Sequence, residues 1–333
     1  MDNIYIIGEV GQAHEGSIAL AHSYIAALAT TGVDAVKFQM HIAEAESSIH
    51  EPFRQTLPYQ EKTRFDYWKR MEFSKQQWLE LKQHCESRKL DFIVSPCSIA
   101  AVNILEEIGM LTFKIGSGEV GNILMLNRIA RSAKNVILSS GMSSLTELDQ
   151  AVDILKTGKS DISILQCTSA YPSRPHQWGI NLIAEWTDRY QLPVGFSDHS
   201  GDIFAALAAA TAGAKLIEFH VVFDKRIAGP DSSSSLTVDQ AITLVTGIRQ
   251  IEIALKNPVT KTDNEHTERL KCIFGKSLAV NKSLTKGHIL TESDLESKKP
   301  KGYGIAPSQY ERILGKPLRN DLEQWDFLTE SHI

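Results

Sequence analysis

The sequence predicts a (β/α)8 barrel, also called a TIM barrel, followed by a small and mostly β domain. Eight short apolar runs rich in β-branched residues predict eight strands, and most of their starts lie 21 to 31 residues apart. This spacing leaves room for two loops and one helix between consecutive strands. Eight such units in about 250 residues fit a closed barrel better than an open doubly wound sheet.

The predicted strands follow one another along the first two thirds of the chain, at residues 4–7, 35–38, 91–94, 112–115, 135–138, 162–165, 193–196 and 216–219. Helical periodicity of apolar residues between them is clearest at residues 19–28 and 203–210. The alternation of strand and helix predicts a parallel sheet.

One interval breaks this rhythm, because the second and third strands start 56 residues apart. The excess lies at residues 41–73 and, in a barrel, covers the carboxyl-terminal face, where active sites are built. We expect Arg64, Tyr67, Trp68 and Arg70 to contact the distal end of a substrate there. The alternative is that the aromatic residues only pack a helix onto the barrel.

After residue 264 the alternation of strands and helices stops. Residues 277–296 contain short strand-like runs, turn signals and one brief helix-like stretch. We therefore predict a barrel at residues 1–263, a linker at 264–275 and a small domain at 276–333. The small domain has too little core to be stable alone, so we expect it to dock.

Composition and charge exclude several classes of protein. The net charge is −5 with no basic cluster, which argues against nucleic acid as a partner. No run approaches 18 uninterrupted apolar residues and no signal peptide begins the chain, which argues against the membrane. The four cysteines have no CxxC spacing, so we expect reduced thiols and a cytoplasmic protein.

Polar residues follow every predicted strand, and the carboxyl ends of parallel strands meet at one rim of a barrel. We therefore expect one polar site built from all eight strands, with Glu9, Lys37, Gln39, Ser95, Lys114, Ser117, Glu119, Ser139, Ser169, Tyr171, Ser197, His199 and His220 as its residues.

Two histidines end neighbouring predicted strands. His199 follows Phe196-Ser-Asp, His220 follows Glu218-Phe, and Asp231 comes eleven residues later. Two imidazoles with a carboxylate close behind are what an open divalent-metal site needs. Either histidine alone would equally suit a structural position in the core.

Lys37 and Lys114 lie inside apolar strands, where an unpaired ammonium group is costly. They favour an anionic substrate, as do serines followed by glycines, which offer hydroxyl and N–H donors. The alternative is that each lysine is paired with a core glutamate or reaches solvent. Glu119 is the best candidate for an acid/base, and Glu9 is a second candidate.

These segments together resemble the sialic acid synthase family, whose members condense phosphoenolpyruvate with an N-acylated hexosamine to give a nonulosonic acid. Residues 286–295 and the surrounding tail are similar to the antifreeze-like (SAF) domain that ends these synthases. The matching segments are Gly8–Gly16, Val36–Gln39, Phe113–Glu119, Ile137–Met142, Cys167–Pro172, Phe196–His199, Glu218–His220 and Gly229–Asp231.

The resemblance implies roles for individual residues. His199 and His220 would bind Mn²⁺ or Mg²⁺, and Glu119 would act at the reacting carbon. Glu9, Tyr171 and Asp231 would contact the open-chain sugar. The phosphoenolpyruvate pocket would be lined by Lys37, Ser95, Lys114, Ser117, Ser139 and Ser197, with Gln39 and Ser169 among the further substrate-binding residues.

The resemblance also implies a domain-swapped homodimer, in which Lys299 reaches the sugar bound by the other chain. Two positions depart from the family pattern. Ala13 stands where Asn is common, and Lys299 stands where an Arg contacts the sugar. Lysine lacks the planar fork of arginine, so we expect the acyl or amide group that it meets to differ.

Two other functions stay open. A related synthase of a shorter 3-deoxy-ulosonate would need basic residues for a phosphorylated acceptor, and Lys62, Arg64, Lys69 and Arg70 supply them. A catalytically silent sugar-binding protein would be favoured by loss of a metal ligand or of Glu119, and all three are present. An ice-binding or structural role is weaker, because the rim keeps its polar set.

Overall fold

The computed structural model describes residues 3–54, 61–261 and 265–333. These residues form two compact units, Met1–Asn257 and Pro258–Ile333. Each unit has its own hydrophobic core and is described by itself. The division between the units falls a few residues before the predicted end of the barrel at residue 263.

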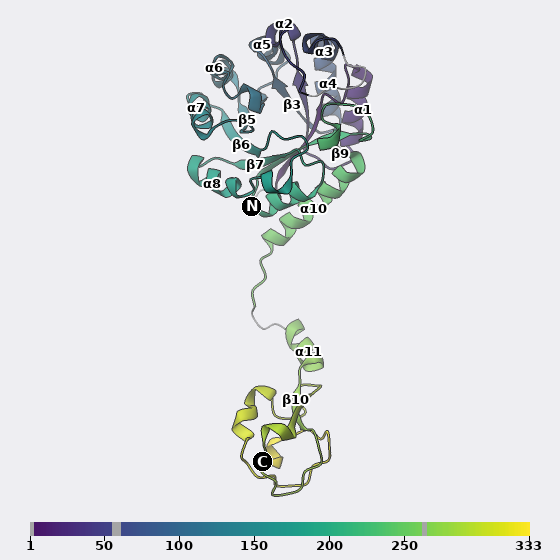
Figure 1. Ribbon diagram of the computed structural model, residues 1–333, viewed down its shortest axis with the longest axis vertical. Helices are drawn as coiled ribbons and strands as arrows, with labels where there is room; N and C mark the ends of the chain where they lie inside the picture. The colour runs from purple at the N-terminus through teal and green to yellow at the C-terminus, as the bar shows by residue number, and fades with distance from the viewer. Residues whose placement is uncertain (1–2, 55–60, 262–264) are drawn as a thin grey trace. The chain divides into compact units, whose positions relative to one another are not determined.

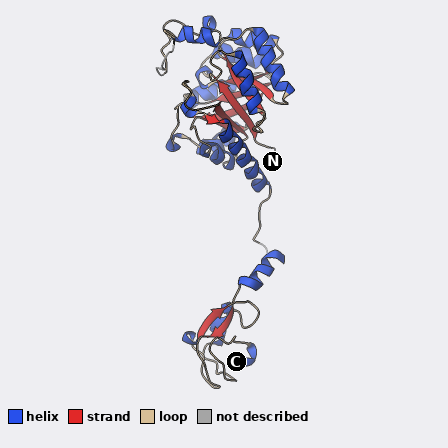
Figure 2. Ribbon diagram, turned by 90° about the vertical axis from the view of Figure 1, so that its right-hand side faces the viewer, coloured by secondary structure: helices blue, strands red, loops and turns tan. Residues whose placement is uncertain are grey.

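The first unit is a closed parallel barrel, as predicted. Each strand pairs with the next, and β1 also pairs with β8, which leaves the barrel with no open edge. Helices surround the strands in Figure 1, and the strands lie inside them in Figure 2. The strands are β1 (Tyr5–Gly11), β2 (Ala35–Met40), β3 (Asp91–Pro96), β4 (Thr112–Ile115), β5 (Asn135–Ser139), β6 (Asp161–Cys167), β7 (Val194–Asp198) and β8 (Leu216–Val222), with the short β9 (Leu236–Thr237) paired to the end of β8.

The helices between strands begin where the sequence places capping side chains. Ser98 follows β3 and accepts a hydrogen bond from the backbone of α5, so the strand end and the helix start are fixed together. Ser17, Ser74, Ser144 and Thr237 cap their helices in the same way. The outer helices are α1 (Ile18–Leu28), α4 (Lys75–Ser87), α5 (Ile99–Glu107), α6 (Ile123–Ser132), α7 (Leu145–Lys156), α8 (Asn181–Tyr190), α9 (Phe204–Thr211) and α10 (Val238–Lys256).

The barrel interior changes from apolar to polar along the strands. Six apolar residues, one from each of six strands, form a separate cluster: Ile7, Ala35, Ile93, Ile137, Leu165 and Leu216. Because side chains alternate between faces of a strand, the residue two positions later points the same way. Those residues are Glu9, Lys37, Ser95, Ser139, Cys167 and Glu218. The polar site therefore lies on an apolar floor, toward the carboxyl ends of the strands.

The insertion at residues 41–73 forms α2 (Ala43–Glu46) and α3 (Arg64–Met71), and its residues 55–60 lie outside the described chain. Tyr67, Trp68 and Met71 form a small buried cluster with Ala43. These aromatic residues therefore lie in a packed cluster, in agreement with the alternative that they pack a helix onto the barrel.

The second unit contains little regular strand, although the sequence predicted a mostly β domain. β10 (Ser277–Val280) and β11 (Leu295–Lys298) pair antiparallel, and isolated bridges and short 3-10 helices complete the unit. The predicted linker contains the helix α11 (Glu265–Phe274), whose charged sequence concealed it. The core residues of the unit are Leu278, Val280, Leu284, Leu290, Ile305, Ile313, Leu318, Leu322, Leu328 and Ile333.

Two further features of the described chain concern membrane-spanning helices and the state of the cysteines. Within it, no helix is both long and apolar enough to cross a membrane. All four cysteines, each in a described segment, are free thiols, in agreement with the absence of a disulfide framework from the sequence.

Candidate active site

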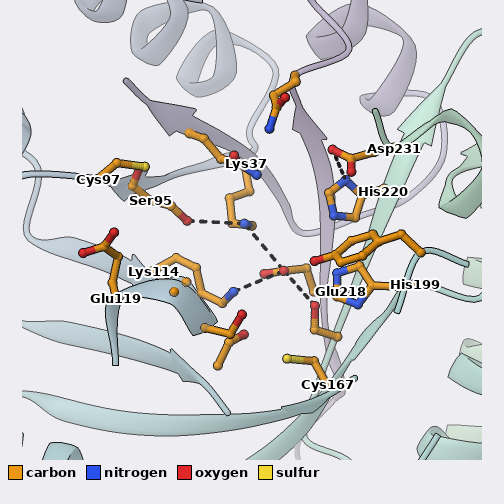
Figure 3. A pocket seen from close by; sticks show the side chains of 18 of the residues that line it. Lys37, Ser95, Cys97, Lys114, Glu119, Cys167, His199, Glu218, His220 and Asp231 are labelled. Carbon is orange, nitrogen blue, oxygen red and sulfur yellow. Dashed lines mark hydrogen bonds and ion pairs between the residues drawn. The ribbon is translucent and has the colours of Figure 1, made fainter. Parts of the chain in front are cut away.

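A pocket of about 240 Å³ opens at the carboxyl ends of the barrel strands. Figure 3 shows side chains from several strands pointing into it. We call it the rim pocket. Twelve of the fifteen residues that the sequence proposed for the site line it: Lys37, Gln39, Ser95, Lys114, Ser117, Glu119, Ser139, Tyr171, Ser197, His199, His220 and Asp231.

The other three proposed residues lie elsewhere. Glu9 is fully buried beneath the pocket and contacts two lining residues rather than the pocket itself. Ser169 lies beside the lining, with its hydroxyl oxygen 3.4 Å from that of Ser117. Lys299 belongs to the second unit, where its ammonium group lies over the ring of Phe274 at 5.2 Å.

Four buried charges form a connected network at the pocket floor, and Figure 3 shows three of them, Lys37, Lys114 and Glu218. The Lys37 ammonium lies 3.1 Å from a Glu9 carboxylate oxygen and 3.5 Å from Glu218 Oε1. Lys114 Nζ is 3.2 Å from the same Glu218 oxygen, which also accepts from Ser197 Oγ at 3.0 Å. Two ammonium groups and two carboxylates cancel in charge. The lysines are therefore paired with core glutamates, the alternative that the sequence left open, and they also line a pocket.

Burial and the pairing with glutamates together shift the pKa values of the two lysines in opposite directions. Burial alone would lower the pKa of Lys37, but the carboxylates of Glu218 and Glu9 outweigh it and raise the pKa. Burial lowers the pKa of Lys114, because the attraction of Glu218 does not offset the loss of water. For Glu218, burial acts to raise the pKa, but Lys114 and Lys37 together hold it at about 2. Lys114 is thus the ammonium group that an added anion would stabilise most.

The imidazoles of His199 and His220 lie together, with ring centroids 5.2 Å apart. Burial, with His220 close by, lowers the pKa of His199 to about 3, so its ring is neutral at ordinary pH. Within the described residues its Nδ1 is buried without a hydrogen-bond partner. Asp231 Oδ2 lies 3.9 Å from His220 Nδ1. A neutral imidazole with an unused lone pair, a second imidazole and a nearby carboxylate fit a divalent metal ion.

Glu119 ends a short 3-10 helix after β4, Ser117–Glu119, and is partly buried. Burial raises its pKa, and a hydrogen bond of 2.8 Å from the amide of Asn122 partly opposes this. A carboxyl group with a raised pKa is suited to proton transfer. Figure 3 shows Glu119 across the pocket from His199 and His220.

The glycine of one Ser-Gly turn is required by close packing. Gly141 has φ of +35°, and a Cβ atom there would lie 2.0 Å from the Cβ of Ser117 and 2.9 Å from the hydroxyl of Ser169. A larger residue would push apart the two serines that edge the pocket.

Two residues of the site, Arg54 and Glu218, were not predicted from the sequence. Arg54, in the insertion, donates to Asp231 Oδ1 at 2.7 Å and to the carbonyl of Pro230 at 2.6 Å, and its guanidinium lies 4.1 Å from the centre of the Tyr171 ring. Nothing local marks Arg54, since its contacts come from distant segments. Glu218 could have been found, because it lies two residues before His220 on the same face of β8.

Arg64 and Arg70, which we expected to face a substrate, do not line the rim pocket. Arg64 lies over the ring of Trp68 at 4.4 Å and near Glu51. Arg70 pairs with Glu15 at 3.0 Å and with Glu61. Both hold the insertion together, so one of its arginines reaches the site but not the ones chosen from the sequence.

Comparison with known proteins adds to this geometry. The sequence pattern of the NeuB family matches residues 24–260, and that of the SAF domain matches residues 275–333. The chain belongs to the NeuB family. It is 34% identical to the N,N'-diacetyllegionaminic acid synthase of Campylobacter jejuni, over 99% of this chain and 100% of the relative. It is 31% identical to the human N-acetylneuraminate-9-phosphate synthase, over 98% of this chain and 91% of the relative.

A solved structure supports the same assignment. The N-acetylneuraminic acid synthetase of Leptospira borgpetersenii superposes with a TM-score of 0.71 and 30% identity, covering 81% of this chain and 91% of that one. The family resemblance and the barrel with a SAF domain are therefore confirmed. The NeuB family member described here is an enzyme of the nonulosonic acid synthase type.

Proposed function

We propose that the protein condenses phosphoenolpyruvate with an open-chain N-acyl amino sugar, with the aid of a divalent metal ion, and releases a nonulosonic acid and phosphate. The observation that carries this proposal is the division of the rim pocket. Buried ammonium and hydroxyl groups occupy its floor, the imidazole pair occupies one side, and a carboxyl group with a raised pKa faces that pair.

Phosphoenolpyruvate binds against the lysines and serines in this account. Lys114 has three ammonium protons, and Glu218 is its one hydrogen-bond acceptor among the described residues. An anionic oxygen placed there would counter the burial that lowers the pKa of Lys114. The hydroxyls of Ser95 and Ser139 line the same floor and donate to the remaining oxygens. Ser197 also lines the floor, but it donates its one proton to Glu218.

His199 and His220 would hold Mn²⁺ or Mg²⁺, which polarises the sugar aldehyde as a Lewis acid when bound. The residues of the chain place the two substrates for attack. C3 of phosphoenolpyruvate adds to the aldehyde carbon, water adds to C2, and phosphate leaves with the bridging oxygen. Lys37 and Lys114 stabilise the anionic groups throughout. Glu119, across the pocket, is positioned to exchange a proton with the water or with the new hydroxyl group.

The acceptor end of the pocket is formed by Tyr171, Asp231 and Arg54. Arg54 holds the carboxylate of Asp231 and covers the face of Tyr171, yet 41% of its own side chain is exposed. Within the described residues its other N–H groups have no hydrogen-bond acceptor, and in this proposal they meet an acyl or hydroxyl oxygen of the sugar. The names of the relatives include a diacetylated product and a phosphorylated one, so acceptors differ within the family.

The SAF unit is proposed to act in trans, with Lys299 reaching the sugar bound by the other chain of a homodimer. Two observations support this proposal. The rim pocket belongs to the barrel unit, and the SAF unit is a separate compact unit with a core of its own. The implied partner is a second copy of the same chain.

The test is release of phosphate from phosphoenolpyruvate by the purified protein, with Mn²⁺ and a panel of N-acyl mannosamine and bacillosamine-derived acceptors, and with pentoses and pentose phosphates as competitors. Release that requires one amino sugar supports the proposal. Release that requires a pentose phosphate instead would identify a 3-deoxy-ulosonate synthase. No release with any acceptor, from folded and metal-loaded protein, would contradict both.

A further inference from the structure

His41, Glu46 and Cys97 meet beside the rim pocket, and none of them has a part in the reaction proposed above. One ligand-type atom of each lies within 4.8 Å of those of the other two. His41 directly follows β2 and Cys97 directly follows β3. These strands are neighbours, with Met40 opposite Pro96, so their register brings the two side chains together. Glu46 is the last residue of α2 and comes from the insertion.

The imidazole and the carboxylate are both almost entirely buried, with 5% and 7% of their side chains exposed. His41 Nδ1 and Glu46 Oε1 are hydrogen-bonded at 2.7 Å. Among the described residues, the second polar atom of each, His41 Nε2 and Glu46 Oε2, has no hydrogen-bond partner. Leaving such an atom buried costs about 1–3 kcal/mol, so a group that binds there would remove an existing penalty.

The third member of the cluster is the thiol of Cys97, to which the proposed reaction gives no role. Burial raises the pKa of Cys97, and the nearby carboxylates of Glu46 and Glu119 raise it further. A protonated thiol is a poor nucleophile, so Cys97 is not suited to covalent catalysis. A bound cation reverses this situation, because coordination removes the thiol proton.

The surroundings hold the ligands in place. The imidazole of His41 stacks on the ring of Trp68, with centroids 3.8 Å apart and planes at 15°. The carboxylate of Glu72 accepts a hydrogen bond of 2.7 Å from the backbone of Ala43, which fixes the start of α2. Fixed outer contacts of this kind orient metal ligands.

We propose that His41, Glu46 and Cys97 bind a thiophilic divalent transition metal ion, of the type of Zn²⁺ or Co²⁺, at a second site distinct from the imidazole pair. One nitrogen, one oxygen and one sulfur ligand favour such ions, whereas Mg²⁺ and Mn²⁺ prefer oxygen. Ligand atoms around a tetrahedral zinc ion lie about 3.4–3.7 Å apart. A separation near the 4.8 Å limit of this cluster therefore closes by roughly 1 Å when the ion binds.

The charges at this second site balance when the ion binds. A dication, a thiolate, a carboxylate and a neutral imidazole sum to zero, which suits a buried position. The thiol proton leaves to solvent, and no electron is transferred. Three protein ligands leave the fourth position of the ion open.

The open position has a consequence for the rim pocket. Glu46, Cys97 and Glu119 together line an adjoining cavity of about 430 Å³, and Cys97 and Glu119 also line the rim pocket. Figure 3 shows Cys97 on the same side of the pocket as Glu119, away from His199 and His220. An ion at this second site therefore inhibits the enzyme by engaging Glu119. This consequence rests on the proposed function of Glu119, whereas binding itself does not.

The test uses the full-length His199→Ala, His220→Ala double variant, which removes the other proposed metal site. Co²⁺ is titrated into it, and the sulfur-to-cobalt charge-transfer absorption is measured. We expect this absorption with one equivalent of Co²⁺, and its loss when Cys97→Ser is added. Zinc affinity, measured by competition with a chromophoric chelator, should fall more than about 100-fold in that variant, because even outer contacts contribute about 10–100-fold. Glu46→Gln should weaken it as well.

Cys167→Ser and Cys272→Ser are the matched controls, since one thiol also lines the rim pocket and the other is exposed. Both should keep the absorption. Its absence from the double variant, or its persistence after Cys97→Ser, would overturn the proposal. A second measurement does not depend on the Cys97 variant folding: Zn²⁺ should protect Cys97 from alkylation in the double variant, as read by mass spectrometry. Equal alkylation with and without Zn²⁺ would also overturn it.

Discussion

Arg54 donates a hydrogen bond of 2.7 Å to Asp231 Oδ1, although 177 residues separate the two in the chain. The same guanidinium covers the face of Tyr171. An inserted segment thus provides one wall of a pocket whose other walls come from the barrel strands and from the segments that follow them. In the proposed reaction the choice of acceptor is thereby linked to the insertion, because the floor residues proposed to bind phosphoenolpyruvate belong to or directly follow the strands.

Arg54→Ala should raise KM for the acceptor sugar by about 10–200-fold and change the ranking of acceptors, since it removes a polar contact from the distal end of the pocket. KM for phosphoenolpyruvate should change little, because Lys37 and Lys114 remain. Steady-state kinetics with both substrates varied measure this. Arg64→Ala and Arg70→Ala are the controls from the same insertion. If all three variants have the same acceptor KM as the wild type, Arg54 does not contact the acceptor.

Glu119→Gln should lower kcat by about 10²–10⁴ with little change in KM for phosphoenolpyruvate, because it keeps the size of the side chain but removes the base. Because the pKa of Glu119 is raised, its basic form is lost at a higher pH than for an ordinary glutamate, and kcat falls below that pH. Asn122→Asp keeps the helix cap but replaces the amide donor with a charge, so the acid limb should move to higher pH. If the acid limb of the kcat profile does not move, that limb reports the titration of a group other than Glu119.

Glu218→Gln should destabilise the fold by about 3–5 kcal/mol, because it leaves Lys114 and Lys37 buried with less negative charge around them. Chemical denaturation measures this loss. Glu44→Gln is the control, since Glu44 is exposed and its ion pair with Lys69 should contribute about 1 kcal/mol or less.

The pH dependence of stability should change in the same variant. The pKa of Glu218 is lowered from 4.5 to about 2 in the folded protein, so its ionised form stabilises the fold above pH 4.5. That contribution is lost as the pH falls from 4.5 through about 2. The wild type should therefore lose stability faster than Glu218→Gln over this interval. If the unfolding free energies of the wild type and of Glu218→Gln change with pH in parallel, Glu218 is not held ionised by the two lysines.

The proposal that Lys299 acts in trans is tested with two inactive full-length variants, His199→Ala and Lys299→Ala. In a mixed dimer one barrel is intact and is covered by an intact SAF unit from the other chain. Co-expression should therefore restore about a quarter of the wild-type activity, since half of the dimers are mixed and each has one complete site. No recovery in demonstrably mixed dimers would place the unit on its own barrel.

The sequence predicted what depends on periodicity along a strand. Strand spacing predicted the barrel, and the meeting of strand ends at one rim predicted that Lys37, Lys114 and His220 share one site. Contacts between distant segments were not predictable in this way. Arg54 has no neighbours in sequence that mark it as a site residue, and its partner Asp231 lies in another loop. Glu9 contains a carboxylate that looks catalytic, but it lies beneath the pocket lining and is paired with Lys37, because the register of β1 and β2 brings the two residues together.

The insertion at residues 41–73 was predicted as a segment over the rim, but the contacts of its individual residues were not predicted. Arg64 and Arg70 were chosen because charged residues on a rim are expected to face substrate. Both instead pair with glutamates and stack on aromatic rings of their own helix. The cluster of His41, Glu46 and Cys97 was also not predictable, because its members follow two different strands and end a four-residue helix.

The most direct test of the proposed reaction follows the bridging oxygen of phosphoenolpyruvate. The full-length protein is incubated with Mn²⁺, an accepted amino sugar and phosphoenolpyruvate that has a heavy-oxygen label between C2 and phosphorus. Both products are then analysed by mass spectrometry. The proposed reaction predicts labelled phosphate and an unlabelled nonulosonic acid, with no turnover after metal removal or in His199→Ala. Label retained in the acid, or phosphate released without any sugar, would contradict it.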